Sequence, residues 1–276
     1  YLPFNEETYS AGVYFNPEFN TNTIRYGYNS MTTPSSVIDF NVDTKSKEII
    51  KQHVNALEED ILISSNSGMT GVVNKFQRIL GLKVPEKFRD CIKIPDNEKP
   101  LVFITHMEHH SNQTSWLETI AKVEVIPPCP KGLFCMDNLK KLLEKYKDST
   151  LKIASVTGGS NVTGIQTPCH EIAKVMHQHG GVCFVDYACA APYVDINMHP
   201  EMEEEHLDAI FFSPHKFLGG PGSAGVLVFN KKLYKNTVPD NPGGGTVSYT
   251  NPWGQHDYFD DVETREDGGT PAFLQT

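Results

Sequence analysis

The sequence lacks several features, and each absence excludes a class of protein. No uninterrupted apolar run approaches about 18 residues, so no membrane-spanning helix is predicted. The first twenty residues contain neither the basic start nor the apolar stretch of a secretion signal. Lys and Arg number 24 against 34 Asp and Glu, which gives a net charge of −10 and no basic excess to bind nucleic acid. We therefore expect a soluble, cytoplasmic protein that binds neither membranes nor nucleic acids.

Cysteine is also scarce. The 276 residues contain six cysteines and no C-x-x-C pair, so the sequence does not describe a disulfide scaffold. Hydrophobic residues make up 39% of the chain, which is enough for a buried core in one large domain or two small ones. The irregular, Asn- and Tyr-rich residues 1–40 precede the region 41–276, which we expect to form the large domain.

Three nucleotide or hydrolase motifs are absent as well. The chain has no G-x-x-x-x-G-K-[ST] P-loop, no G-x-G-x-x-G directly after a predicted strand and no G-x-S-x-G elbow. These absences argue against a P-loop nucleotide site, a Rossmann dinucleotide site and an α/β-hydrolase.

Strand-like and helix-like segments alternate from Thr44 onward. Short apolar runs predict strands over 61–64, 101–106, 122–126, 152–157, 182–188, 207–213 and 224–230. Helical periodicity predicts helices over 45–57, 72–80, 115–122, 137–148 (capped by Asp137) and 169–180. Apolar strands separated by helices are typical of an α/β fold with a mostly parallel sheet and helices on both faces.

Polar and small residues follow five of these strands. Ligands of open α/β sheets bind outside the carboxyl ends of the strands, so these residues form the candidate site. They are Ser67–Gly71, Glu108–Asn112, Gly158–Gly164, Asp186 and Ser213–Lys216.

Each of these groups has an ordinary structural interpretation as well. The segment around Gly68, Met69 and Thr70 suits a phosphate at a helix N-terminus or a simple helix cap. Asp186 ends an apolar strand and needs an N–H partner, from the backbone or from a ligand. Lys216 is either a solvated loop residue or an amine held in a pocket for Schiff-base chemistry.

The histidines and the acidic run give no prediction of a metal site. His109 and His110 are adjacent and lack further ligands at suitable spacing. The histidines at 170, 177 and 179 are interpreted as surface residues, and residues 201–205 as a solvated acidic loop.

Taken together, the groups after the strands describe one ligand. The small-residue loop would bind a phosphate, and Asp186 would bind a pyridinium nitrogen. A stacking partner would hold a flat ring, and Lys216 would react with an aldehyde. These are the parts of a pyridoxal 5′-phosphate site.

The segments GMTGVVNKF, MEHHSNQTSW, SNVTGIQTP, VDYACAAPYVDI and FSPHKFLGGPGSAGVLV carry a family resemblance. The sequence resembles the class V aminotransferase family of fold-type I pyridoxal-phosphate enzymes, and within it the cysteine desulfurase and selenocysteine lyase branch. The resemblance covers about residues 45–275.

The resemblance implies a role for ten residues. Lys216 matches the lysine that forms the Schiff base, Asp186 the carboxylate on the pyridine nitrogen, and His109 the ring that stacks on the cofactor and relays protons. The remaining cofactor-binding matches are Gly68, Met69, Thr70, Ser213 and His215 at the phosphate, Asn161 near the cofactor O3′ and substrate carboxylate, and Thr246 reaching the phosphate of a partner subunit. A homodimer is implied by the last of these.

The sequence also departs from the family pattern. Cys189 stands where the desulfurases have a Gln that bonds the cofactor phenolate, and we interpret it as a space-filling residue or, alternatively, a reactive thiol. The substrate-carboxylate Arg and persulfide Cys of the family would lie beyond residue 276, so we expect the chain to lack the C-terminal small domain. Arg265 is expected to be structural.

The resulting prediction is a pyridoxal-phosphate enzyme that acts on an amino acid through Lys216. Cleavage of the C–S bond of cysteine-like substrates is the leading activity. Aminotransferase, epimerase or other β-lyase activity, or a catalytically silent scaffold with this fold, are the alternatives.

Overall fold

The computed structural model describes residues 9–13, 23–30, 36–95, 98–218, 220 and 222–269. The chain divides into two units, Tyr1–Gln52 and His53–Thr276. The candidate site lies entirely in the larger unit.

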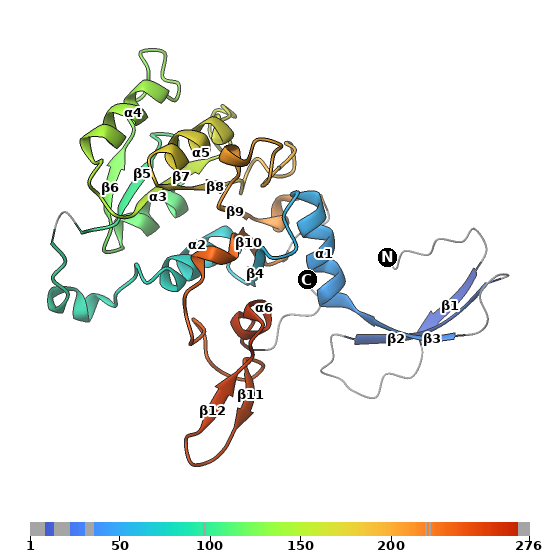
Figure 1. Ribbon diagram of the computed structural model, residues 1–276. Helices are drawn as coiled ribbons and strands as arrows, with labels where there is room; N and C mark the ends of the chain where they lie inside the picture. Colours follow the sequence, from blue (N-terminus) through green and yellow to red (C-terminus); the bar gives the residue numbers. More distant parts are fainter. Residues whose placement is uncertain are drawn as a thin grey trace. The chain divides into compact units, whose positions relative to one another are not determined.

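A seven-stranded sheet forms the centre of the larger unit, in the order β4-β10-β9-β8-β7-β5-β6 (Figure 1). The strands are β4 (Ile61–Ser65), β5 (Leu101–Ile104), β6 (Lys122–Val125), β7 (Lys152–Thr157), β8 (Val182–Asp186), β9 (Ala209–Phe212) and β10 (Gly225–Phe229). Neighbours among β5 to β9 pair in parallel, whereas β10 is antiparallel to both β4 and β9. The predicted α/β fold with a mostly parallel sheet is therefore confirmed.

The reversed direction of β10 is not part of the sequence prediction. Between β9 and β10 the described residues form a loop and the 3-10 turn Pro214–Lys216, with no crossover helix. A parallel neighbour requires a longer crossover, usually through a helix, so the short connection returns the chain antiparallel.

Helices cover both faces of the sheet. They are α2 (Gly68–Ile79), α3 (His110–Leu117), α4 (Met136–Lys145), α5 (Cys169–Gln178) and α6 (Val262–Glu266), with 3-10 turns at Glu86–Cys91, Glu203–Glu205, Pro214–Lys216 and Lys231–Leu233. Alternation along β8 directs Phe184 toward α2 and Cys183 toward α5, where the Cys183 thiol lies 3.9 Å from the Cys169 carbonyl oxygen.

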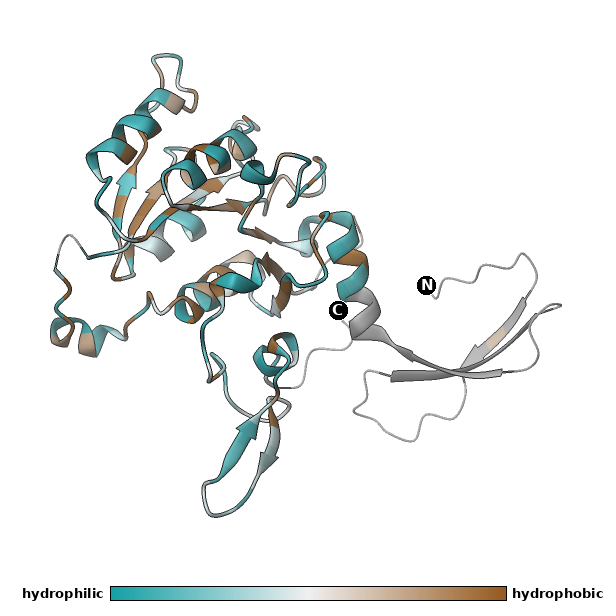
Figure 2. Cartoon of the chain, in the orientation of Figure 1, coloured by the Kyte–Doolittle hydropathy of each residue, from teal (hydrophilic) through white to brown (hydrophobic). Residues whose placement is uncertain are grey.

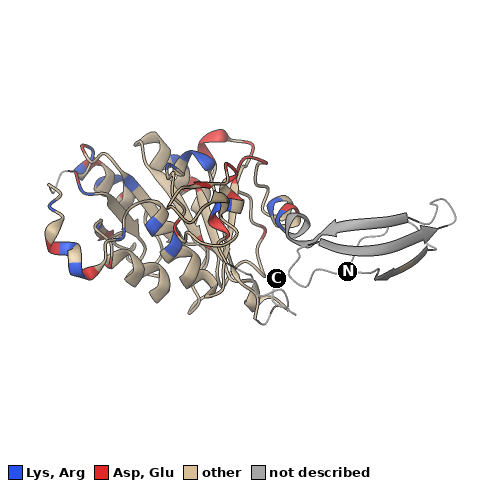
Figure 3. Cartoon of the chain, turned by 90° about the horizontal axis from the view of Figure 1, so that it is seen from below, with Lys and Arg blue, Asp and Glu red and all other residues tan. Residues whose placement is uncertain are grey.

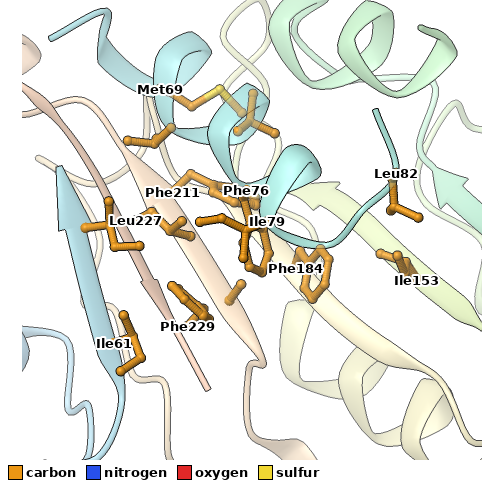
Figure 4. Packing of buried hydrophobic residues seen from close by; sticks show 14 of the residues in the cluster. Ile61, Met69, Phe76, Ile79, Leu82, Ile153, Phe184, Phe211, Leu227 and Phe229 are labelled. Atoms are coloured by element: carbon orange, nitrogen blue, oxygen red, sulfur yellow. The ribbon is translucent and has the colours of Figure 1, made fainter. Parts of the chain in front are cut away.

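Phe76 of α2 lies at the centre of the apolar core (Figure 4). Its ring centroid is 5.1 Å from Phe184, 5.9 Å from Phe211 and 4.9 Å from Phe229, so it joins three neighbouring strands. Hydrophobic residues concentrate on these central strands (Figure 2). The core thus fixes the start of α2 relative to the ends of β8 and β9.

Lys and Arg, as well as Asp and Glu, occur along the chain of this unit (Figure 3). A hairpin of β11 (Val247–Thr250) and β12 (His256–Tyr258) precedes α6.

Among the described residues, no helix has the length and apolar character needed to cross a membrane.

The smaller unit contains an antiparallel sheet of β1 (Tyr9–Val13), β2 (Thr23–Ser30) and β3 (Ser36–Asn41), followed by α1 (Val42–His53). These strands correct the expectation of irregular structure over residues 1–40. Ile24, Tyr26 and Tyr28 alternate in β2 and are β-prone residue types, which is the signal that the many Asn and Thr residues obscured. The other residues of 1–40 lie outside the described residues, and the boundary at residue 41 stays a prediction.

Four of the five predicted helices begin earlier than predicted: α1, α2, α3 and α4 begin at Val42, Gly68, His110 and Met136 rather than at 45, 72, 115 and 137. Helix α3 begins five residues earlier than predicted. The His109 side chain accepts a hydrogen bond from the Ser111 amide and caps the start of this helix. Helix α4 begins after Cys135, and Asp137 lies in its first turn rather than at its cap.

Candidate active site

The carboxyl ends of five strands lie at one edge of the sheet. β4 and β9 are both antiparallel to β10, so β4 runs in the same direction as β5, β7, β8 and β9. The polar segments that follow these strands in the sequence therefore gather at this edge, as the sequence predicts for an open α/β sheet.

The start of α2 and the loop after β9 meet at this edge. The Met69 amide donates a hydrogen bond to Ser213 Oγ at 2.9 Å, and Ser213 is buried. Gly68 has a φ of +60°, and a Cβ there would lie 2.8 Å from His215 Cε1, so the position suits only glycine. The Thr70 hydroxyl shares a 2.6 Å hydrogen bond with Ser111 Oγ.

We call Gly68, Met69, Thr70, Ser213 and His215, the residues predicted to bind a phosphate, the phosphate cradle. The structure brings these five predicted residues together. The first turn of α2 contains no acidic side chain, so the positive end of the helix dipole faces the cradle without a competing carboxylate. The arrangement is suited to an anion.

Asp186, at the end of β8, is only 3% exposed. Its Oδ1 accepts a hydrogen bond from the Ala188 amide at 2.8 Å. Burial raises the pKa of Asp186 to about 6, although the Ala188 amide and the positive charge of Lys216 both oppose this shift. A buried carboxylate of this kind is stabilised by a cationic N–H group.

His109 caps α3 at the same edge. Its Nδ1 accepts the Ser111 amide at 3.1 Å, which places the proton of the neutral ring on Nε2. Partial burial lowers the pKa of His109, and the charges of Lys216 and His110 lower it further. A neutral ring with a fixed tautomer can stack on a flat ligand and donate a hydrogen bond.

Glu108 belongs to the predicted site segment Glu108–Asn112, but the sequence did not indicate a role for it. One of its carboxylate oxygens accepts hydrogen bonds from the Thr105 amide, the Thr105 hydroxyl and the Thr157 amide, at 3.2, 2.6 and 3.0 Å. The other accepts the Asn112 side-chain amide at 2.7 Å. Glu108 thus joins the ends of β5 and β7 and fixes the start of α3, where His109 lies.

Burial raises the pKa of Glu108 to about 7, against the lowering effect of these hydrogen bonds. The nearby Asp186 carboxylate raises it further. The signal for Glu108 in the sequence is its place between a buried strand and His109, where an acidic residue needs partners.

A cavity of about 500 Å³ lies beside Lys216. The lining residues include Asn161, Cys189 and Tyr193. Asn161 and Tyr193 are exposed, so the cavity is open to solvent on this side. The structure therefore brings Asn161 and Lys216 to one space large enough for a small ligand.

The Cys189 thiol donates a hydrogen bond to the Gly159 carbonyl oxygen at 3.0 Å. Burial raises the pKa of Cys189, and the charge of Asp186 raises it further. A thiol with a raised pKa is a poor nucleophile, which favours the space-filling interpretation over the reactive one.

Thr246 is fully buried within its own loop. Its hydroxyl donates to the Gly243 carbonyl oxygen at 2.7 Å and accepts the Gly243 amide at 3.1 Å. These bonds close the turn that precedes the β11–β12 hairpin. The structure shows Thr246 in this structural role, and its contact with the phosphate of a partner subunit stays a prediction.

Arg265 makes structural contacts. Its guanidinium donates to the Phe259 carbonyl oxygen at 3.3 Å and lies 5.2 Å from the centre of the Tyr234 ring. These contacts hold α6 against the preceding loop, as the sequence interpretation expects.

The profile of the class V aminotransferase family matches residues 92–276. The chain belongs to this family. A probable cysteine desulfurase of Halalkalibacterium halodurans is 31% identical over 175 residues, which are 62% of this chain and 40% of that protein. The cysteine desulfurase of Escherichia coli (strain K12 / DH10B) is 32% identical over 176 residues, with the same coverage. The predicted resemblance to the cysteine desulfurase branch is thereby confirmed.

Solved structures show the same fold. A cysteine desulfurase from Escherichia coli has a TM-score of 0.64 at 24% identity and covers 83% of this chain and 53% of its own. The apo cysteine desulfurase from Thermococcus onnurineus NA1 has a TM-score of 0.62 at 23% identity, over 83% of this chain and 52% of its own. This chain spans about two-fifths of the length of the curated relatives that it matches.

Proposed function

We propose that the protein binds pyridoxal 5′-phosphate at the carboxyl edge of the sheet and uses it to cleave the C–S or C–Se bond of a cysteine-like amino acid. The observation that carries the proposal is the convergence of Lys216, the buried Asp186 and the phosphate cradle at this one edge. No single one of these features requires the cofactor, but each provides for a different part of it.

The residues fit the cofactor on three structural grounds. The cradle has room because Gly68 carries no Cβ, which would lie 2.8 Å from His215. Asp186 is a buried carboxylate that a pyridinium N–H would stabilise, since burial holds its pKa near 6. Lys216 borders a cavity of about 500 Å³ that can receive a substrate.

When bound, pyridoxal phosphate supplies an aldehyde that condenses with amines and a ring that accepts electrons from the substrate. Lys216 would hold the cofactor covalently and, once released by the substrate amine, serve as the base at the substrate carbon. Asp186 would keep the ring nitrogen protonated, and His109 would hold the ring flat. Asn161 would orient the substrate carboxylate from the cavity wall.

The choice of C–S cleavage rests on the relatives, which are named cysteine desulfurases. Because those proteins are longer than this chain, the activity is proposed for the whole protein. A homodimer is proposed with it, with Thr246 near the partner's cofactor. All six cysteines are free thiols, which is in keeping with a reducing, cytoplasmic location.

Cofactor uptake tests the first part of the proposal. The purified protein should develop a visible absorption band on addition of pyridoxal phosphate, and borohydride reduction followed by peptide mass mapping should place the label on Lys216. Lys216→Ala should abolish both signals, whereas Lys141→Ala, at an exposed position of α4, should leave them unchanged. A label distributed over several lysines, or an equal band in the Lys216→Ala protein, would contradict the assignment.

Product analysis tests the reaction. With cysteine and a thiol reductant, desulfurase activity yields alanine and sulfide, whereas a β-lyase yields pyruvate, ammonia and sulfide. Amino transfer requires a keto acid and releases no sulfide. Cofactor uptake without any sulfide would refute C–S cleavage while leaving the cofactor assignment intact.

A further inference from the structure

A second cluster of chemically active side chains lies at the opposite edge of the sheet. His177 is in the last turn of α5, and His206 and Asp208 precede β9. The Asp208 carboxylate also accepts the amide of Cys183, near the amino end of β8, at 2.8 Å. Since Asp186 ends β8 and Lys216 follows β9, the cluster is separated from the candidate active site by the length of these strands.

Three ligand-type atoms converge in this cluster. His177 Nε2 lies 2.9 Å from Asp208 Oδ2, and His206 Nε2 lies 3.3 Å from Asp208 Oδ1. The two imidazole rings are stacked, with centroids 4.1 Å apart and an interplanar angle of 17°. One ligand atom from each residue lies within 4.8 Å of the others. Imidazole nitrogens and a carboxylate oxygen are the donors that Zn²⁺ and related transition metals prefer.

Backbone carbonyl groups fix the orientation of both rings. His177 Nδ1 lies 2.6 Å from the Glu204 carbonyl oxygen, and His206 Nδ1 lies 2.6 Å from that of Glu203. A carbonyl oxygen can only accept, so each Nδ1 carries a hydrogen atom. In a neutral ring the lone pair is then on Nε2, which is the atom directed at Asp208.

This pattern is the one that metal-ligating histidines show, in which the second ring nitrogen donates to a carbonyl or carboxylate group. Without a cation, two lone pairs would face a carboxylate. A proton on one ring would relieve only one of these contacts, and a proton on each ring would place two positive charges in stacked rings 4.1 Å apart. A metal ion between the three ligand atoms removes both conflicts.

The surroundings of the cluster favour a cation. The side chains of His177, His206 and Asp208 are 15%, 25% and 9% exposed, so the ligand atoms are shielded but reachable. His206 also borders a cavity of about 540 Å³, whose wall has four acidic residues (Glu59, Asp60, Glu201, Glu203) against two basic ones (Lys231, Lys232). Water molecules in this cavity can complete the coordination of an ion that has three protein ligands.

We propose that His177, His206 and Asp208 form a binding site for a divalent transition-metal cation, with Zn²⁺ as the probe. The sequence interpretation had His177 as a surface histidine and residues 201–205 as a solvated loop. The structure gives this acidic segment a different task, since its backbone carbonyl groups orient the two imidazole rings.

Metal titration of the chelator-treated protein tests the proposal. Calorimetry with Zn²⁺ near neutral pH should show one saturable equivalent, and Co²⁺ should give the visible absorption of a low-symmetry N/O site. His177→Gln and His206→Gln should each weaken binding by at least about 100-fold, since each removes a direct ligand. His179→Gln is the matched control, because this residue directly follows the same helix and its ring contacts the Val175 carbonyl oxygen rather than Asp208.

Thiols are a competing source of Zn²⁺ binding. The Cys129 and Cys135 side chains interact with each other, so the titrations are done in a Cys129→Ser/Cys135→Ser background. Uptake of pyridoxal phosphate and far-ultraviolet circular dichroism verify that each variant is folded, since the cofactor site lies at the other edge. Absence of saturable binding, or equal binding by the two ligand variants, would show that the cluster is an ion-paired structural group only and would overturn the proposal.

Discussion

At the scale of single residues, two buried carboxyl groups distinguish the candidate active site. Asp186 ends β8 and Glu108 follows β5, and the charge of Asp186 adds to the effect of burial on the pKa of Glu108. Asp186 has one backbone hydrogen bond on Oδ1, whereas Glu108 accepts four from three residues. Glu108 is therefore suited to positioning the surrounding loops, and Asp186 to receiving a ligand cation.

Asp186 should make the stability of the cofactor-free protein depend on pH. Its pKa is raised from 3.8 to about 6 in the folded state, so the folded protein holds this proton more tightly than the unfolded chain. The stabilisation is complete below about pH 4 and is lost as the pH rises through about 6, a loss on the order of 3 kcal/mol. Urea unfolding across this range should show that Asp186→Asn lacks this component.

The matching test uses the cofactor. Pyridoxal phosphate should restore more stability to the wild-type protein above pH 6 than to Asp186→Asn, because only the carboxylate pairs with a ring N–H. Because the Asp186 charge raises the pKa of Glu108, the stability gained from the cofactor is compared with the cofactor-free state of the same protein. If wild type and Asp186→Asn show parallel pH profiles with and without cofactor, Asp186 does not contact the ring nitrogen.

The sequence was sufficient to place Asp186 and Lys216 at the carboxyl edge of the sheet, because polar residues directly after apolar strands are visible in the sequence. Their roles at a cofactor stay predictions. Glu108 could not be assigned in the same way, since its importance lies in hydrogen bonds to Thr105 and Thr157 that only the paired strands create. For Thr246 the sequence resemblance implies a ligand contact, whereas in the structure its hydroxyl is hydrogen-bonded within its own turn.

At the scale of elements, the beginning of α2 determines the phosphate cradle. Gly68 starts the helix with a φ of +60°, and Gly225 of β10 passes so close that a Cβ there would lie 2.1 Å from the Gly68 backbone. Two glycines thus allow a helix start and an antiparallel strand to approach each other. The sequence predicts both elements, but not the direction of β10 or their contact.

Gly68→Ala tests the cradle, and Gly81→Ala, just after the same helix, is its control. Both positions have a positive φ, +60° and +70°, so each substitution should cost about 1–2 kcal/mol in backbone strain. Only the Gly68 substitution places a Cβ against His215, whereas nothing lies within 4 Å at Gly81. Gly68→Ala should therefore weaken pyridoxal-phosphate binding by at least about tenfold, or about 1.4 kcal/mol.

Fluorescence or absorbance titration of the two variants measures the difference. Gly81→Ala should bind the cofactor as wild type does, with lower stability toward urea. Unchanged binding by a folded Gly68→Ala protein would show that the phosphate lies elsewhere.

The sequence predicts the order of the helices and strands more accurately than their first and last residues. The strand predicted over 152–157 is the observed β7, because its apolar run is bounded by a loop on each side. The start of α3 was missed because its cap is a histidine, a residue type not among the usual capping residues. The strand β2 was missed although Ile24, Tyr26 and Tyr28 alternate, because its other residues are typical of loops.

At the scale of the larger unit, a buried ion pair joins α6, which lies in the segment after β10, to helix α2. Lys75 of α2 lies 3.2 Å from the Glu266 carboxylate of α6, and their side chains are 5% and 0% exposed. Glu266 also accepts hydrogen bonds from the Tyr234 hydroxyl at 2.8 Å and the Asp240 amide at 3.2 Å. One carboxylate therefore gathers three parts of the chain beside the helix that begins at the phosphate cradle.

Removal of one partner of this pair should destabilise the protein strongly. Lys75→Met leaves the Glu266 charge buried without its cation, which typically costs about 3–5 kcal/mol. The exposed Arg89–Glu118 pair is the internal control, because its side chains are 44% and 60% exposed and Arg89→Met should cost about 1 kcal/mol or less. In the double variant Lys75→Met/Glu266→Gln the buried charge is absent, so its cost should be smaller than the sum of the two single substitutions. Urea unfolding of the wild type, the two single variants, the double variant and the control gives these differences. A loss for Lys75→Met no larger than that for Arg89→Met would show that Glu266 holds the segment through Tyr234 and Asp240 alone.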